Sequence, residues 1–228
     1  MILSDSEILK EMQVGNIRID NFRPSQLNGA SYNVRLADEL LVYETDYIDP
    51  IKGYVSTAFG TLDMKKKNPT KTIKIPEEGY VLYPGRLYLG MTVERTFTGP
   101  KLEPIFDGRS SVGRLGLFVH VTAGFGDPGF DGHWTLEITP IQPIRIYADV
   151  NIGQVYYHPL KGKCLKPYRG KYQGNSGIQA SMMYKDFECS EHHERPAYMS
   201  VTLNRFVPED EVEDNDPLET KACIEAGR

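Results

Sequence analysis

The sequence predicts a mostly β fold, a sandwich or barrel of short strands, with one short helix at the N-terminus. Apolar and polar residues alternate with a period of two in several short runs, which is the pattern of half-buried strands. The 21 glycines and 15 prolines of the 228-residue chain separate these runs and mark turns. Within the first hundred residues, helical spacing of apolar side chains occurs only near the start.

The expected helix begins after Ser4, because Ser4 and Glu7 have the spacing of a capping box. Gly15 can end this helix. Three apolar side chains between these points fall on one helical face: Ile8, Leu9 and Met12.

The alternating runs that predict strands are spread over the first 140 residues. They comprise Ile17 and Ile19; Leu87, Leu89, Met91 and Val93; Leu117, Val119 and Val121; and Trp134, Leu136 and Ile138. Short runs of this kind, broken by Gly and Pro, indicate an all-β sandwich or barrel.

The composition is that of an ordinary globular protein, with 40% hydrophobic and 25% charged residues. The net charge of -5 argues against a protein that coats nucleic acid, because such proteins carry a basic face. No apolar run approaches the about 20 residues of a membrane span, and the start lacks the layout of a signal peptide. Three scattered cysteines favour a reducing compartment. We therefore expect a cytoplasmic protein that binds neither nucleic acid nor membrane.

The composition changes toward the C-terminus. Residues 208–219 hold seven acids and no base, a run that is typical of a flexible, self-repelling tail. We therefore expect one compact domain over residues 1–187 and an acidic, flexible extension over residues 188–228.

The chemistry is expected within residues 107–138, which hold seven glycines. Here Ser110 and Ser111 lie between Arg109 and Arg114. If Ser110 begins a short helix, its free N–H groups can bind phosphate and the arginines can add charge-assisted bonds. An ordinary capped turn with surface arginines explains the same pattern.

Residues 123–132 form a glycine-rich stretch that predicts a tight hairpin between two strands. Asp127 either caps the turn or accepts a hydrogen bond from a sugar hydroxyl. Phe130 belongs either to the core or beneath a sugar ring, where it would leave no room for a 2′-hydroxyl.

The strand that follows is expected to place Trp134, Leu136 and Ile138 on one face, with Thr135 and Glu137 on the other. Glutamate is uncommon in strands. Glu137 is therefore either a solvent-facing residue or a partly buried carboxylate that moves protons near neutral pH.

The run GRSSVGRLGLFVHVTAGFGDPGFDGHWTLEI closely resembles the central block of dCTP deaminases, which belong to the trimeric dUTPase superfamily. The resemblance extends over most of residues 1–187. Further matching stretches are NGASYNVRL at residues 28–36, Tyr83-Pro84-Gly85, Ile152-Gly153-Gln154 and Gly170-Lys171-Tyr172-Gln173-Gly174. The resemblance implies a dUTPase-like β-clip, a distorted jelly-roll, and a homotrimer with active sites between subunits.

The resemblance also implies roles for individual residues. The implied catalytic residues are Glu137, Ser110, Arg114 and Asp127, and the implied substrate-binding residues are Arg109, Ser111, Phe130, Thr135, Leu136, Gln154, Tyr168, Lys171 and Asn175. Residues 109–114 would hold the triphosphate, and the segment around Lys171 would close over the nucleotide as a lid. The expected ligands are dCTP and, besides it, dUTP or dTTP. Magnesium would arrive on the triphosphate rather than in a protein cage.

Deamination of cytosine needs water to add at C4, a proton to reach N3 and ammonia to leave. Glu137 could serve as base and then as acid, while Ser110 and Arg114 position the water and stabilise charge at C4. The zinc-dependent route has an H-x-E and P-C-x-x-C signature, and this chain contains no C-x-x-C. His192-His193-Glu194 does not predict a metal site, because adjacent strand residues point apart.

Ala123-Gly124-Phe125 resembles the Ala-Gly-aromatic sequence of family members that also cleave the triphosphate and release dUMP with pyrophosphate. Asp127 resembles the aspartate that places the attacking water in dUTPases. We therefore expect this bifunctional reaction. The alternatives are a deaminase that releases dUTP, a pure dUTPase, and a non-catalytic nucleotide sensor.

Four positions depart from the family pattern, among them Ser176, which follows Asn175 where a basic or amide residue is usual. Gly126 stands where Ile or Val is usual, Asn175 where Gln is usual, and Asn33 where Asp is frequent. Gly126 could loosen the hairpin that positions Asp127, and the shorter side chain of Asn175 could weaken closure over the phosphates.

Overall fold

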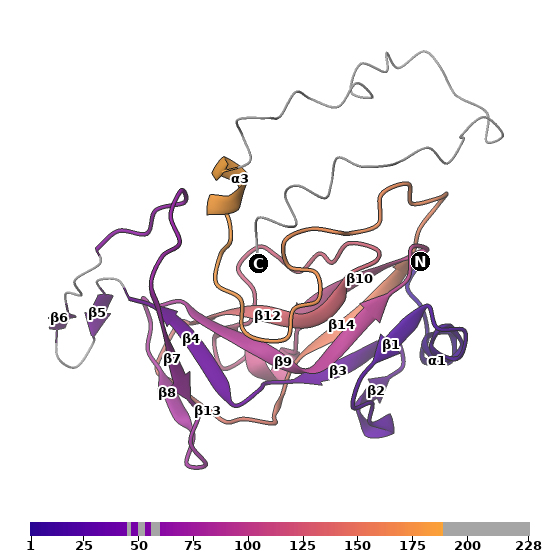
Figure 1. Cartoon of the computed structure of the whole chain (residues 1–228). Helices are drawn as coiled ribbons and strands as arrows, with labels where there is room; N and C mark the ends of the chain where they lie inside the picture. The colour runs from indigo at the N-terminus through magenta and orange to yellow at the C-terminus, as the bar shows by residue number, and fades with distance from the viewer. Residues whose placement is uncertain (45–46, 50–52, 56–59, 189–228) are drawn as a thin grey trace. The chain divides into compact units, whose positions relative to one another are not determined.

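The computed structural model describes residues 1–44, 47–49, 53–55 and 60–188, and their architecture is mostly β (Figure 1). The chain divides into two compact units. The first contains Met1–Asp63 and Lys67–Met182, and the second contains Met64–Lys66 and the chain from Met183. The helix α3 (Tyr184–Glu188) belongs to the second unit. Residues 189–228, which include His192-His193-Glu194, lie outside the described residues, so the expected boundary at residue 187 stays a prediction.

The helix α1 (Asp5–Gln13) confirms the N-terminal helix expected from the capping pattern. The Ser4 hydroxyl accepts a hydrogen bond from the Glu7 N–H at 3.4 Å. Gly15 follows the helix with a φ of 78°, a conformation that glycine adopts readily. Ile8 is fully buried, whereas Leu9 is exposed, so only part of the expected apolar face packs against the core.

The larger sheet has six strands among the described residues, in the order β11-β12-β9-β4-β7, with β1 also paired to β9. Their bounds are β1 (Ile17–Ile19), β4 (Glu39–Tyr43), β7 (Thr70–Lys74), β9 (Tyr88–Thr98), β11 (Leu117–Phe118) and β12 (Asp131–Pro140). All of these pairs are antiparallel. β12 runs along one edge of β9, and β1 and β4 share its other edge.

The second sheet has the order β10-β14-β3-β2. Its strands are β2 (Leu27–Asn28), β3 (Ser31–Arg35), β10 (Leu102–Gly108) and β14 (Asn151–Pro159). Two further strand pairs are β8 (Tyr80–Leu82) with β13 (Ile144–Ile146), and β5 (Tyr47–Asp49) with β6 (Gly53–Val55). The short helices η1 (Pro24–Gln26) and α2 (Ser110–Gly113) complete the first unit. Buried apolar side chains from both larger sheets form one core cluster. Among the described residues, none of the helices has the length and apolarity to span a membrane.

The central strand β9 buries the less apolar of its two faces. The alternation over residues 87–93 predicted this strand correctly, but Met91 and Val93 are only partly buried. The buried set on the opposite face is polar: Thr92, Glu94, Thr96 and Thr98. Arg35 satisfies Glu94, with 2.7 Å from its Nε to Oε1 and 2.8 Å from its backbone N–H to Oε2. A buried charge is tolerated when hydrogen bonds of this kind compensate its desolvation.

Candidate active site

The segment 109–114 forms a short helical turn. Ser110 begins α2, as predicted, and Arg109 occupies the N-cap position with an extended backbone. The Arg114 N–H donates to the Ser110 carbonyl at 3.0 Å. The side chains of Ser110, Ser111 and Arg114 are exposed. Because α2 leads into β11, which pairs with the C-terminal end of β12, the segment lies beside that end of the strand.

The side-chain amide of Gln154 joins the residue before this segment to Ser31 of β3. Its Nε2 donates to the Gly108 carbonyl at 3.1 Å, and its Oε1 accepts from the Ser31 hydroxyl at 2.9 Å. Arg109 is fixed in a similar way, because its Nη1 donates to the Asn151 carbonyl at 3.2 Å. Both polar atoms of the Gln154 side chain thus have a partner within the chain, and its contact with the nucleotide stays a prediction.

Glu137 is held on the outward face of β12 by backbone donors from another loop. Its Oε2 accepts from the N–H of Val121 at 2.8 Å and of Thr122 at 3.4 Å. The alternation predicted for this strand is confirmed, since Trp134 and Ile138 are buried on the opposite face. Sequence reasoning placed Val121 in an alternating run but did not connect it or Thr122 with Glu137, because a backbone donor leaves no signature in residue type.

Leu136 presents only its backbone to the outward face. Its side chain is 1% exposed and belongs to the core cluster. The expectation that Leu136 lies beside a base therefore does not hold for its side chain, because the strand period turns this residue inward.

Residues 119–130 form a longer connection than the tight hairpin that was expected. The strands β11 and β12 are antiparallel neighbours, but the chain between them docks on β10 of the other sheet. There the Gly124 carbonyl accepts from the Phe106 N–H at 2.7 Å, and the Gly126 N–H donates to the Pro104 carbonyl at 2.9 Å. The hairpin prediction was wrong because turn residues do not reveal backbone bonds to a second sheet.

A β-turn at the end of this connection presents Asp127. The Phe130 N–H donates to the Asp127 carbonyl at 3.1 Å. Pro128 and Gly129, with a φ of 90° at the glycine, suit the two central positions of a type II turn. The side chain of Asp127 is exposed, so its carboxylate is open to a ligand or a water.

Phe130 and Tyr168, both expected in the nucleotide site, lie against each other with ring centroids 5.8 Å apart. The ring centroid of Phe130 also lies 5.6 Å from that of Trp134. The Tyr168 backbone N–H donates to the Pro128 carbonyl at 2.7 Å, and burial raises the pKa of the Tyr168 hydroxyl. Lys171 lies further along the same segment, with its Nζ 5.9 Å from the centroid of the Tyr172 ring.

Gly126 fits the chain because Trp134 fills the space beside it. A Cβ at residue 126 would lie 2.4 Å from the indole Cη2 and 2.9 Å from both Cγ and O of Pro104. The chain thus leaves no room for a Cβ at Gly126, and the suggested loosening of the turn before Asp127 stays a prediction. Close packing by the indole replaces the branched side chain that is usual in the family.

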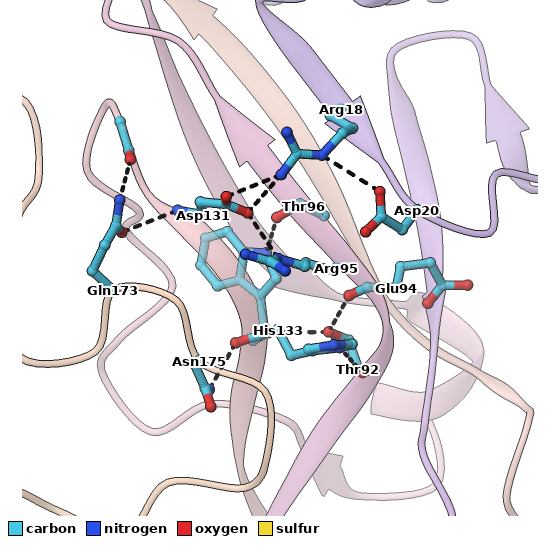
Figure 2. A network of polar contacts seen from close by, with 12 residues as sticks. Arg18, Asp20, Thr92, Glu94, Arg95, Thr96, Asp131, His133, Gln173 and Asn175 are labelled. Atoms are coloured by element: carbon cyan, nitrogen blue, oxygen red, sulfur yellow. Dashed lines mark hydrogen bonds and ion pairs between the residues drawn. The ribbon is translucent and has the colours of Figure 1, made fainter. Parts of the chain in front are cut away.

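Asn175 is turned toward β12 rather than toward a ligand (Figure 2). Its Nδ2 donates to the His133 carbonyl at 3.0 Å and to Thr135 Oγ1 at 3.4 Å, and its Oδ1 accepts from the Gly177 N–H at 3.1 Å. Thr135 Oγ1 also accepts from the Gln179 N–H at 3.2 Å. Asn175 is only 7% exposed. Both polar atoms of its side chain have partners within the chain, and its contact with substrate stays a prediction.

The expected site residues thus fall into separate groups within one chain. One group is the segment 109–114 with Gln154, and a second is Glu137 with its loop. The third comprises Asp127, Phe130, Thr135, Tyr168, Lys171 and Asn175. Over the described part of the chain, no hydrogen bond joins Ser110 or Arg114 to Glu137.

Exposed apolar side chains follow α2 along the chain. Five side chains of this region are each more than half exposed: Leu115, Phe118, Val121, Phe125 and Ile141. Exposed apolar groups gathered in this way mark interaction surfaces. In the part of the chain that the structure covers, no cluster of three or more His, Cys, Asp or Glu side chains is arranged to hold a metal ion.

The same fold occurs in a solved structure of a 2′-deoxycytidine 5′-triphosphate deaminase from Agrobacterium tumefaciens. The TM-score is 0.52 at 20% sequence identity, over 70% of this chain and 48% of that chain. At this identity the likeness concerns the fold alone, and the mostly β class with a short N-terminal helix predicted from the sequence is confirmed.

Sequence comparison narrows this class to one family. A family model described as dCTP deaminase-like matches residues 2–160, so the chain belongs to the dCTP deaminase-like family. A relative from Hathewaya histolytica is 54% identical over 82% of this chain and 100% of its own length. Another, from Clostridium beijerinckii, is 55% identical over 82% of this chain and 99% of its own. Both relatives are named dCTP deaminase, dUMP-forming.

Proposed function

We propose that the protein converts dCTP and two water molecules into dUMP, pyrophosphate and ammonia. The observation that carries this proposal is the placement of Glu137, a carboxylate held on the outward face of β12 by two backbone N–H groups. Relatives above 50% identity that are named as dUMP-forming dCTP deaminases support the same reaction.

In the first step, Glu137 acts as base and then as acid on the cytosine ring. Its Oε2 is occupied by Val121 and Thr122, which leaves Oε1 for a water molecule. Glu137 takes a proton from this water as the oxygen adds at C4, and delivers it to N3. Glu137 then carries the proton of the new C4 hydroxyl to the amino group, which leaves as ammonia as C4 becomes a carbonyl. Positioned proton transfer of this kind contributes about 10²- to 10⁴-fold to a rate.

In the second step, a water molecule attacks the α-phosphorus of the uracil nucleotide. The bond to the bridging oxygen breaks, pyrophosphate leaves and dUMP remains. Asp127 is the residue that we assign to this water, because its carboxylate is exposed at a turn beside Phe130 and Tyr168. Its resemblance to the water-placing aspartate of dUTPases supports this role.

The triphosphate is assigned to residues 109–114, where Arg109 and Arg114 flank two exposed serines. Arginine forms strong charge-assisted bonds with phosphate oxygens. Magnesium is proposed to enter as the counter-ion of the triphosphate, in keeping with its habit of binding through substrate phosphates. dUTP and dTTP are further candidate ligands of this segment. A reducing cytoplasmic location stays a prediction that rests on the scattered cysteines.

We further propose a homotrimer with active sites shared between subunits, in which Arg114 and Glu137 of one site come from different chains. The exposed apolar side chains around α2 support burial of that face by a second copy. If the sites are shared, inactive Glu137→Gln and Arg114→Ala chains refolded together will regain activity, because mixed trimers contain sites free of both changes. Failure of the mixture to regain activity would argue against shared sites.

The experiment that tests the proposed reaction is product analysis with dCTP and magnesium, beside a Glu137→Gln control. We expect equal amounts of dUMP, pyrophosphate and ammonia from the wild-type protein, and a loss of about 10²- to 10⁴-fold in ammonia release from the variant. Binding of dCTP by the variant, measured by calorimetry, will show that the site remains formed.

Each alternative predicts a different result. Accumulation of dUTP would identify a deaminase that lacks the second step. Cleavage of added dUTP together with untouched dCTP would identify a pure dUTPase. If neither nucleotide changes although both bind, the protein is a nucleotide sensor and the role of Glu137 is refuted.

A further inference from the structure

Gln173 and Asp131 form a clamp on the turn at residues 127–130, which carries Asp127. Gln173 holds the turn directly through its side-chain amide. Its Oε1 accepts from the Asp131 N–H at 3.1 Å, and its Nε2 donates to the Gly129 carbonyl at 2.8 Å (Figure 2). One side-chain amide thus pairs with the peptide groups on both sides of Phe130. The backbone of the same segment adds a third bond, from the Tyr168 N–H to the Pro128 carbonyl at 2.7 Å.

Asp131 anchors this clamp to the larger sheet. Its Oδ1 accepts from Arg18 Nη2 and from Arg95 Nε, both at 2.9 Å, and its Oδ2 accepts from Arg18 Nη2 at 3.0 Å. Its backbone carbonyl accepts from the Gly174 N–H at 2.8 Å. Figure 2 shows Asp131 between the two arginines on one side and Gln173 on the other. Asp131, the first residue of β12, is therefore bonded to β1 through Arg18, to β9 through Arg95, and to residues 173 and 174 near the end of the first unit.

The clamp leaves Asp127 exposed while it engages the rest of the turn. The carbonyls of residues 127, 128 and 129 and the N–H groups of residues 129, 130 and 131 all have hydrogen-bond partners. Glu137 depends on different contacts, since Val121 and Thr122 hold its carboxylate. The two carboxylates assigned to the two steps are thus positioned by independent sets of bonds.

We propose that Gln173 and Asp131 are positioning residues for triphosphate cleavage, acting through the turn that presents Asp127, and that deamination does not depend on them. This inference rests on the proposed two-step function. After deamination, bound dUTP either is cleaved or dissociates. A loosened turn slows cleavage without changing the chemistry at C4, so dUTP will escape from the site.

The test measures the ratio of dUTP to dUMP formed from dCTP, together with ammonia release, for wild type, Gln173→Ala, Gln173→Glu and Asp131→Asn. Small displacements of a reacting group slow a reaction by about 10- to 100-fold. We therefore expect dUTP to become a main product of Gln173→Ala, with ammonia release within about twofold of wild type. Gln173→Glu keeps the size of the side chain but removes the donor to Gly129, so it will also release dUTP.

The matched control is Gln13→Ala, an identical change at an exposed position of α1. It is expected to give the wild-type product ratio. With added dUTP as substrate, Gln173→Ala will show a lower kcat and a nearly unchanged KM. An unchanged thermal unfolding curve will show that the lower kcat does not come from a loss of folded protein.

The outcomes separate this inference from the function on which it rests. If wild type itself accumulates dUTP, the proposed second step fails and the inference fails with it. If wild type forms only dUMP and all three clamp variants do the same, the two-step function stands and the positioning role is refuted. A parallel fall in ammonia and dUMP, without dUTP, would also overturn it.

Discussion

Replacement of Gly126 by valine tests whether this glycine and Trp134 form a matched pair. The family usually has Ile or Val at this position, yet here a Cβ would lie 2.4 Å from the indole. Ordinary contact begins at about 3.4 Å, so the ring must move by about 1 Å before the two γ carbons are placed. We therefore expect Gly126→Val to be harmful here, although it restores the usual residue.

The expected cost follows from overpacking of a filled core. Forcing extra carbons into such a site costs about 1–3 kcal/mol, which lowers the Tm of a chain of this size by about 2–12 °C. Trp134→Val alone removes ring contacts with Phe106 at 5.8 Å and Phe130 at 5.6 Å, and the bond from Nε1 to Thr96 Oγ1 at 2.9 Å. Large-to-small changes of a core tryptophan cost about 3–5 kcal/mol.

The double variant distinguishes a matched pair from two independent defects. In Gly126→Val/Trp134→Val the new side chain enters space that the indole has left, so the double variant should be more stable than the sum of the single changes by about 1–3 kcal/mol. Thermal unfolding of the four proteins at one fixed concentration measures this coupling, since assembly makes the Tm depend on concentration. Additive losses would refute the argument that Trp134 explains Gly126.

Two further predictions concern buried polar groups. Thr92 Oγ1 accepts from the Trp134 N–H at 3.0 Å and donates to the Glu94 carbonyl at 2.8 Å. Thr92→Val should therefore lower the free energy of unfolding by about 1–3 kcal/mol, whereas Thr92→Ser should keep a free energy of unfolding near that of wild type. Equal urea midpoints for Thr92→Val and wild type would contradict this. The Tyr157 hydroxyl is buried with no hydrogen-bond partner in the described parts of the chain, so Tyr157→Phe should raise the free energy of unfolding by about 1 kcal/mol at neutral pH. Burial raises the pKa of the Tyr157 hydroxyl. The neutral hydroxyl therefore stabilises the fold at pH values below the ordinary tyrosine pKa of about 10, and this stability is lost as the pH rises above that value. Tyr157→Phe should accordingly unfold at higher pH than wild type, and identical alkaline unfolding curves by circular dichroism would count against this.

Local patterns in the sequence were sufficient to predict several parts of the site. The alternation around Glu137 placed its carboxylate opposite Leu136, and the serines after Gly108 predicted the start of α2. The same alternation misjudged β9, where the buried face carries Glu94. Burial of a polar face depends on partners such as Arg35, which come from another sheet.

Local sequence patterns did not predict the contacts of side-chain amides. Asn175 and Gln154 were expected to face the nucleotide, but the structure uses both amides within the chain. Gln173 carried no signal of its clamping role. Residue type does not reveal which of several donors and acceptors an amide will meet, since that depends on the register of segments far apart in the chain.

The sequence by itself determined the strand alternation, the capped first helix, the start of α2 and the family to which the central motif belongs. These features depend on the order of neighbouring residues, and a period of two or a cap is complete within a few positions. Only the tertiary structure decided that the loop after β11 docks on β10, that Trp134 occupies the space beside Gly126, and that Asp131 joins two arginines to the C-terminal segment. Each of these contacts joins segments that the chain brings together only when both sheets pack, so its partners are set by packing rather than by local order.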